Sequence, residues 1–84
     1  MATPEELEAA AKRVNTLATA PSTSDTLELY GLYKQGTIGD VDTPRPGMLD
    51  VRGRAKWDAW SKRKGTTPEA ARDAYVALAK RLGA

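Results

Sequence analysis

Residues 24–38 read SDTLELYGLYKQGTI, and the spacing of their apolar side chains predicts a helix. At about 100° per residue, one face of this helix is expected to pack into a core, and it holds Leu29, Leu32 and Gly36. The opposite face is expected to point toward solvent, and it holds Glu28, Gly31 and Gln35. A third arc combines an aliphatic residue, two phenols and an ammonium group: Leu27, Tyr30, Tyr33 and Lys34. A bundle helix needs only a core face and a solvent face, so the third arc favours an amphipathic ligand.

Capping signals predict where this helix and three others begin. The central helix is expected to be capped by Ser24 or Asp25 and to run to about Ile38. Residues 3–6, TPEE, form a capping box with proline at the first helical position, and apolar residues recur at helical spacing from Leu7 to Leu17.

Two further capping signals follow in the second half of the chain. Asp50 is expected to cap a third helix over residues 51–63, and residues 66–69, TTPE, predict a second capping box that opens a last helix ending at Gly83. No segment has the pattern of a strand. The predicted fold class is therefore all-α, a four-helix bundle.

The connection between the second and third predicted helices is long for so small a chain. Residues 39–50, GDVDTPRPGMLD, hold two prolines and two glycines and show no periodicity. Loops of about a dozen residues are usually either functional or linkers. The whole chain of 84 residues is long enough for one domain and too short for two, so residues 1–84 are expected to form a single domain.

The composition argues against most enzyme classes. The chain has no cysteine and no histidine, so thiolate chemistry, the commonest general base and nearly every zinc site are excluded. No catalytic residue and no metal site is predicted. The absence of cysteine fits a reducing compartment, and no apolar stretch is long enough to span a membrane, so a cytoplasmic location without membrane insertion is expected.

Charge is distributed unevenly along the chain. Residues 1–44 carry three basic and seven acidic side chains, whereas residues 45–64 carry seven basic and two acidic ones. A basic segment on a domain of small net charge suggests an anionic partner. A solvated helix face, a small nucleic-acid-binding module and a protein-interaction bundle are alternative interpretations of the same pattern.

Several residues of the pattern suit an adenine and phosphate group together. Tyr30 and Tyr33 offer π-surfaces for a purine and hydroxyls for phosphate oxygens, and Lys34 offers a charge-assisted donor. Lys56 borders the face of the third helix that holds two indoles, Trp57 and Trp60, both expected in the core. The alternative is that the tyrosines pack at the edge of the bundle with Lys34 lying over them, and that Tyr75 on the last helix is a core residue.

Four motifs at fixed spacing carry a resemblance to a known family: YGLYKQ (30–35), TIGD (37–40), RPGM (45–48) and KWDAW (56–60). The spacing continues through KGT (64–66) to Tyr75. Together these residues resemble the acyl-coenzyme A binding protein family over about residues 5–82.

The resemblance implies a four-helix bundle in up-down-down-up order, with the long loop as an overhand connection between the second and third helices. It implies a carrier, monomeric and without a cofactor, that binds medium- to long-chain acyl-coenzyme A and no nucleic acid. By position, Tyr33 would stack on the adenine, and the 3′-phosphate would be held by Tyr30, Lys34 and Lys56. Tyr75 would line the site from the last helix, and Leu27 would touch the acyl chain. No feature identifies the enzymes that supply or accept the ligand.

The chain departs from the family pattern at a few positions. Asn15 stands where a lysine facing the phosphates is frequent, so we expect that contact to be weaker or to be supplied by Lys12 or Arg13. Ala20 replaces another frequent lysine. Leu7 and Val51 stand where aromatic residues are common, and a smaller core is expected from them.

Overall fold

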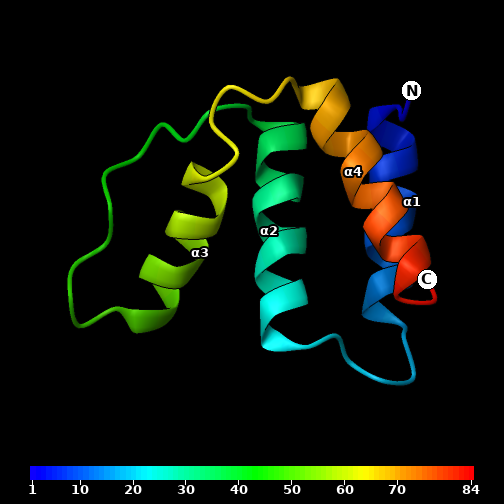
Figure 1. The fold of residues 1–84 in the computed structure, drawn as a ribbon, viewed down its shortest axis with the longest axis horizontal. Coiled ribbons are helices and arrows are strands. Elements are labelled where there is room, and N and C mark those ends of the chain that lie inside the picture. Colours follow the sequence, from blue (N-terminus) through cyan, green and yellow to red (C-terminus); the bar gives the residue numbers. More distant parts are fainter.

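The computed structural model describes residues 1–84 as four helices joined by three connections (Figure 1). The helices are α1 (Pro4–Asn15), α2 (Thr23–Thr37), α3 (Val51–Ser61) and α4 (Pro68–Arg81). In Figure 1, α1 and α4 run in one direction and α2 and α3 in the other, which is the up-down-down-up order expected. The predicted all-α fold is confirmed. None of the helices has both the length and the hydrophobicity needed to cross a membrane.

The first helix begins as predicted, and the second begins earlier than predicted. The Thr3 hydroxyl accepts from the Glu6 N–H, and the Glu6 carboxylate accepts from the Thr3 N–H, which completes the capping box. The second helix is capped by Ser22, whose hydroxyl accepts from the Asp25 N–H at 3.1 Å. Asp25 therefore lies in the first turn, where its negative charge interacts favourably with the helix dipole. The prediction of a cap at Ser24 or Asp25 is wrong.

The two later helices also begin at capping residues. Asp50 accepts from the Gly53 N–H, as predicted for the third helix. In α4 the cap is Thr67, which accepts from the Ala70 N–H. Because Ala70 occupies the position where a capping box needs Glu or Gln, the second predicted capping box does not form.

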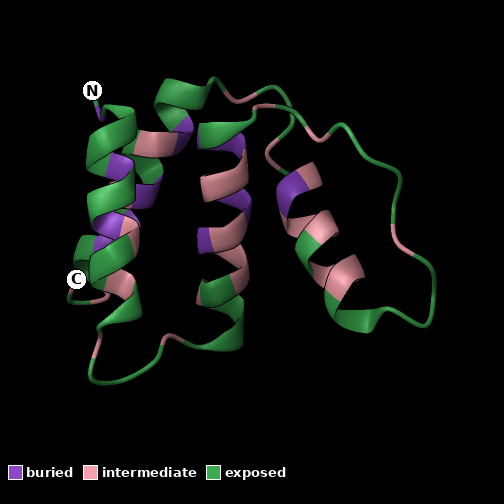
Figure 2. Ribbon diagram, turned by 180° about the vertical axis from the view of Figure 1, so that it is seen from behind, coloured by how far each residue is buried: buried purple, intermediate pink, exposed green.

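The α2 helix is the central element, with α1 and α4 on one side and α3 on the other (Figure 1). Buried residues lie where α1, α2 and α4 meet, and α3 has a single buried residue, Trp60 (Figure 2). The core cluster joins α1, α2 and α4 and consists of Leu7, Ala10, Leu29, Leu32, Ala71, Tyr75, Leu78 and Ala79. The prediction that Leu29, Leu32 and Gly36 face the core is confirmed.

The face of α2 predicted to meet solvent is partly covered by α3. Gly31 and Gln35 are buried, so the prediction that they are exposed is wrong. A methyl group added at Gly31 would lie 2.8 Å from the carbonyl carbon of Ala59 and closer still to its oxygen. The missing side chain at Gly31 is therefore what lets the backbones of α2 and α3 approach each other.

Gln35 is buried because its amide joins two connections to the end of α2. Its Nε2 group donates to a carboxylate oxygen of Asp40 at 2.9 Å and to the carbonyl oxygen of Thr66 at 2.7 Å. The Gly65 N–H donates to the same Asp40 oxygen. The hydrogen bond from the Gly65 N–H, and to a lesser extent the one from Gln35, lowers the pKa of Asp40 below its ordinary value.

The long connection, residues 39–50, is fastened to α3 by side chains. The Trp60 indole N–H donates to the carbonyl oxygen of Gly39, and the Trp57 indole N–H donates to that of Thr43. Arg45 forms a two-point ion pair with Asp58, at 2.8 and 3.0 Å. Trp60 is buried, but Trp57 is only half-buried, so the prediction that both indoles are core residues is wrong for Trp57.

A candidate ligand-binding groove between α1, α2 and α4

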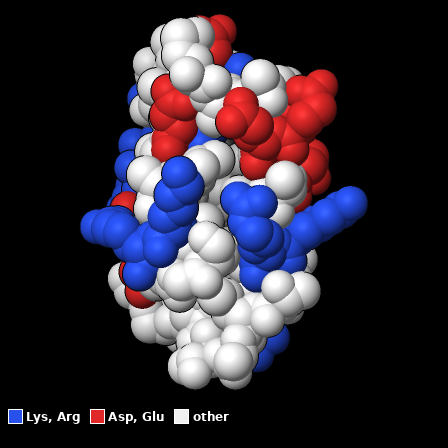
Figure 3. All heavy atoms as spheres, turned by 90° about the vertical axis from the view of Figure 1, so that its right-hand side faces the viewer, with Lys and Arg blue, Asp and Glu red and all other residues white.

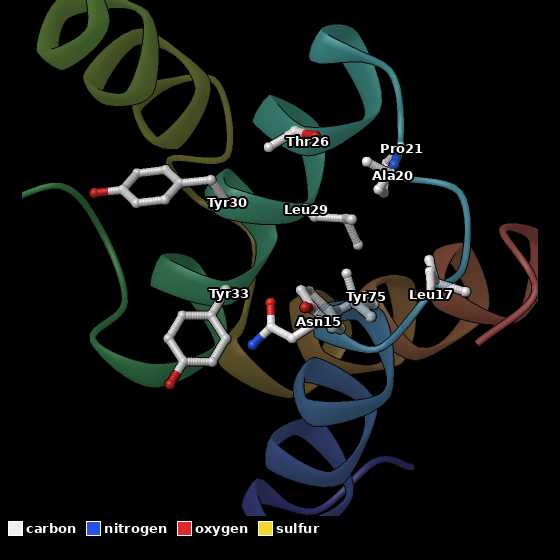
Figure 4. Close-up of a pocket in the computed structure, with 10 residues that line it drawn as sticks. Asn15, Leu17, Ala20, Pro21, Thr26, Leu29, Tyr30, Tyr33 and Tyr75 are labelled. Carbon is white, nitrogen blue, oxygen red and sulfur yellow. The ribbon is translucent and has the colours of Figure 1, made fainter.

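An open groove of about 400 Å³ lies beside the start of α2, where the end of α1 and the middle of α4 approach it (Figure 4). It brings together four predicted site residues: Asn15, Tyr30, Tyr33 and Tyr75. The rest of the lining is mostly apolar, and half of it comes from the connection between α1 and α2: Val14, Leu17, Ala20, Pro21, Thr26 and Leu29. This is the size and the lining of an ordinary small-molecule site.

Two of the three tyrosines contact each other inside the groove. The rings of Tyr33 and Tyr75 meet edge to face, with 6.1 Å between their centroids and 61° between their planes. Tyr75 is buried and belongs to the core cluster, so it is both a core residue and part of the groove lining. Tyr33 is half-buried, which leaves part of its ring accessible.

Both phenols are held in the protonated form. The Tyr33 hydroxyl donates to a Glu8 carboxylate oxygen at 2.7 Å, and this hydrogen bond, followed by burial, raises the pKa of Tyr33. Burial raises the pKa of Tyr75. At neutral pH the two side chains are therefore neutral rings with hydroxyl donors, not anions that would repel a phosphate.

A second hollow of about 340 Å³ continues from the first between α2 and α3. The two hollows share Pro21 and Thr26, so they meet at the start of α2. The second hollow brings together Leu27 and Lys56 and adds a cation that was not singled out in the sequence, Arg52. Leu27 and Lys56 thus lie in a hollow that adjoins the one lined by the three tyrosines.

The two predicted lysines each lie over an aromatic ring of the facing helix. Lys56 on α3 has its Nζ atom 5.5 Å from the centroid of the Tyr30 ring on α2, so its ammonium reaches across between the two helices. Lys34 on α2 has its Nζ atom 4.9 Å from the centroid of a ring of Trp60 on α3. Both are within the range of a cation–π interaction. Lys34 lines neither hollow.

Arg13 and Lys12 lie apart from both hollows. The face of the molecule in Figure 3 shows acidic side chains toward one end and basic side chains in the middle. The charges follow helix position: the first turns of α1 and α4 carry acids, and the last turns carry Lys12, Arg13, Lys80 and Arg81. Helix dipoles favour this arrangement without a ligand. Arg13 is exposed and lines neither hollow, so the structure does not bring it to the other candidate residues.

Two members of the site could not be found from the sequence. Glu8 is 25 residues away from Tyr33, and no local spacing indicates their hydrogen bond. Arg52 was one of seven basic residues in its segment, and only the approach of α3 to α2 distinguishes it.

Comparison with known proteins assigns the family. Residues 4–79 match the family model described as Acyl CoA binding protein. An acyl-CoA-binding protein homolog of Drosophila melanogaster is 46% identical over 78 residues, which are 93% of this chain and 91% of the relative. The acyl-CoA-binding protein homolog 1 of Caenorhabditis elegans is 52% identical over 73 residues, which are 87% of this chain and 85% of the relative.

Solved structures agree with these matches. The crystal structure of Oryza sativa Acyl-CoA-Binding Protein 2 is similar with a TM-score of 0.88 and 45% identity, over 93% of this chain and 85% of that one. The solution structure of the yeast acyl coenzyme A binding protein is similar with a TM-score of 0.76 and 46% identity, over 95% and 93% of the two chains. These matches give no support to a nucleic-acid-binding or protein-interaction module, and the family is one of binding proteins, not of enzymes. The chain belongs to the acyl-CoA-binding protein family.

Proposed function

We propose that the protein binds medium- to long-chain fatty acyl-CoA thioesters and acts as a monomeric intracellular carrier built from one acyl-CoA-binding domain. The observation that carries this proposal is the joined pair of hollows at the start of α2, one lined by three tyrosines and the other by Leu27 and Lys56. Aromatic and apolar side chains in one hollow, with cations in the adjoining one, match a ligand with a charged nucleotide head and an apolar tail. Family membership supports the same ligand. A cytoplasmic location remains a prediction from the sequence.

In this proposal the head of the ligand lies against α2 and the facing side of α3. Tyr33 stacks on the adenine, using the part of its ring that remains exposed beside Tyr75. Lys56 already lies over Tyr30 and needs little reorganisation to hold a 3′-phosphate with the Tyr30 hydroxyl. Lys34 lies one helical turn after Tyr30 on α2 and completes the phosphate contacts from its place over Trp60.

The α1 side of the proposed site contributes the Glu8 carboxylate but no cation. Asn15 and Ala20, the two positions where lysines are frequent in the family pattern, both line the first hollow. Arg13 and Lys12 lie outside it, so they do not replace the missing charges in this arrangement. We infer that the cations on α2 and α3 carry most of the electrostatic attraction to the head, with Asn15 contributing a neutral hydrogen bond.

The proposed tail contact does not require chemistry at the thioester. Burying one methylene contributes about 0.8 kcal/mol, so an acyl chain seated against apolar side chains can supply a large part of the binding free energy. Leu27 lines the hollow between α2 and α3 and is half-buried. The proposed role is therefore sequestration and transport. Titration calorimetry with a series of acyl-CoA ligands tests it.

Replacing Tyr33 tests whether its ring contributes to ligand binding or only to the stability of the fold. Tyr33→Ala is expected to weaken binding of a long-chain acyl-CoA by about 1–3 kcal/mol, the usual contribution of one base–aromatic stack. Tyr33→Phe is the matched control, because it keeps the ring and removes the hydroxyl that donates to Glu8. The Phe variant should retain its affinity and lose only about 1 kcal/mol of stability, as for one hydrogen bond. If Tyr33→Ala lowers the melting temperature but leaves the affinity of the folded protein unchanged, the stacking role is wrong.

Replacing the lysines tests the 3′-phosphate site. Lys34→Ala and Lys56→Ala should each weaken binding by roughly 1.5–3 kcal/mol, the range for hydrogen bonds to charged groups. A thioester lacking only the 3′-phosphate should bind the unmodified protein more weakly and should be nearly insensitive to either substitution. Lys64→Ala is the control, since Lys64 is exposed and lines neither hollow. Equal losses in all three variants, with either ligand, would mean a diffuse basic surface in place of a phosphate site.

A further inference from the structure

The turn before α3 displays the most exposed large apolar side chains of the chain apart from Met1. The Asp50 N–H donates to the Gly47 carbonyl oxygen at 3.0 Å, and this hydrogen bond closes a turn with Met48 and Leu49 at its apex. Leu49 is 99% exposed and Met48 is 79% exposed. Val51, at the first position of α3, is 73% exposed. We name Met48, Leu49 and Val51 the apolar tip.

The apolar tip is held in place by hydrogen bonds on both sides. Asp50 closes the turn with its N–H and caps α3 with its carboxylate, which accepts from the Gly53 N–H at 2.9 Å. Just before the turn, Arg45 is paired with Asp58. Leu49 and Met48 line none of the hollows of the molecule. The exposure of these side chains is therefore a property of an ordered surface and does not serve the groove described above.

Two arginines without ion-pair partners follow the tip on α3. Arg52 and Arg54 lie in the first turn of α3 after Val51, and the salt bridges of the structure include neither of them. The acids of this segment are both engaged, since Asp50 caps the helix and Asp58 is paired with Arg45. A convex apolar tip beside unpaired cations is complementary to a surface that is anionic outside and apolar beneath.

We infer that the apolar tip docks the protein on an anionic phospholipid bilayer, with the tip in the interface and Arg52 and Arg54 on the headgroups. A phospholipid surface fits better than a protein groove because the apex side chains stand on a projecting turn, with the cations immediately behind them. Figure 1 shows this turn at the same end of the molecule as the start of α2 and the connection between α1 and α2. The hollow between α2 and α3 lies at this end too, because its lining includes Pro21, Thr23 and Arg52. The inference rests on exposure and charge, and it does not depend on which ligand the hollow takes.

Flotation with vesicles tests the docking surface. Vesicles of phosphatidylcholine and phosphatidylserine in equal parts are expected to retain the protein at low salt, and vesicles of phosphatidylcholine alone to retain far less. Retention should fall as salt is raised, because screening weakens the attraction of the cations to the headgroups. Leu49→Asp should lower the fraction bound to the acidic vesicles about tenfold or more, because a fully exposed leucine would otherwise gain the burial of its side chain.

Ile38→Asp is the matched control, because Ile38 is also an exposed aliphatic residue and lies at the opposite end of α2. It should leave vesicle binding unchanged. Equal losses in the two variants, or no binding of the unmodified protein to acidic vesicles, would overturn the inference. If the unmodified protein self-associates without vesicles and Leu49→Asp abolishes this, the apolar tip binds a second copy of the chain and the inference is wrong. Acyl-CoA affinity measured without vesicles should be unchanged by Leu49→Asp, so a failure of the proposed ligand function would be seen separately.

Discussion

Gly31→Ala is expected to lower the free energy of unfolding by about 1–3 kcal/mol, the usual result of forcing extra volume into a packed contact. The added methyl group would lie 2.8 Å from the Ala59 carbonyl carbon, and that atom belongs to helix backbone that cannot turn aside. The α3 helix would have to move away from α2. For a chain of this size each kcal/mol corresponds to roughly 4–8 °C in the melting temperature, so thermal unfolding followed by circular dichroism should detect the change.

Gly36→Ala controls for helix propensity. Both glycines lie within α2, and alanine is favoured over glycine in a helix by about 1 kcal/mol. At Gly36 the nearest neighbour of an added methyl group is the Cγ atom of Arg72, at 2.9 Å, and the guanidinium of that side chain donates to the carbonyl oxygens of Ala2 and Gly36. A side-chain atom can shift where the backbone of α3 cannot, so Gly36→Ala should cost less stability than Gly31→Ala. If the two variants were equally stable, the close approach of α2 and α3 would not be a feature of the protein in solution.

The sequence predicted the existence of the helices better than their surroundings. Capping residues identify each helix locally, because a side-chain oxygen and a backbone N–H three residues later satisfy each other without help from the rest of the fold. The burial of Gly31 and Gln35 has a different origin. It follows from α3 covering a second side of α2, and hydrophobic periodicity detects only the apolar side. A glycine at a helix contact and a glutamine bonded to two loops carry no apolar signal.

The same distinction applies to the site. Tyr30, Tyr33 and Lys34 could be grouped from the sequence because one helix places them at i, i+3 and i+4. Their neighbours from other helices could be grouped only through the family resemblance, and the structure brings Tyr75 and Asn15 into the same groove. Glu8 was missed because its hydrogen bond to Tyr33 depends on how α1 packs against α2.

The largest effect is expected from the acyl chain of the ligand. Affinity should rise as the chain lengthens, by up to roughly fourfold for each added methylene, and then level off once the apolar side chains of the two joined hollows are covered. Free coenzyme A lacks the tail and should bind weaker than a long-chain thioester by several orders of magnitude. Binding of the longer ligands should also show a more negative heat-capacity change, because more apolar surface is buried. Calorimetric titration of the series measures both quantities.

Two substitutions divide this dependence between the tail and the head. Leu27→Ser removes apolar surface from the hollow between α2 and α3, so it should reduce the gain in affinity per methylene and leave free coenzyme A unaffected. Lys56→Ala should weaken every ligand of the series by the same factor, because the head is common to all of them. The first variant then changes the slope of binding free energy against chain length, and the second changes only its intercept. Equal affinity of the unmodified protein for free coenzyme A and for its long-chain thioester would rule out the carrier function. A slope that Leu27→Ser leaves unchanged would keep the function but place the acyl chain elsewhere on the molecule.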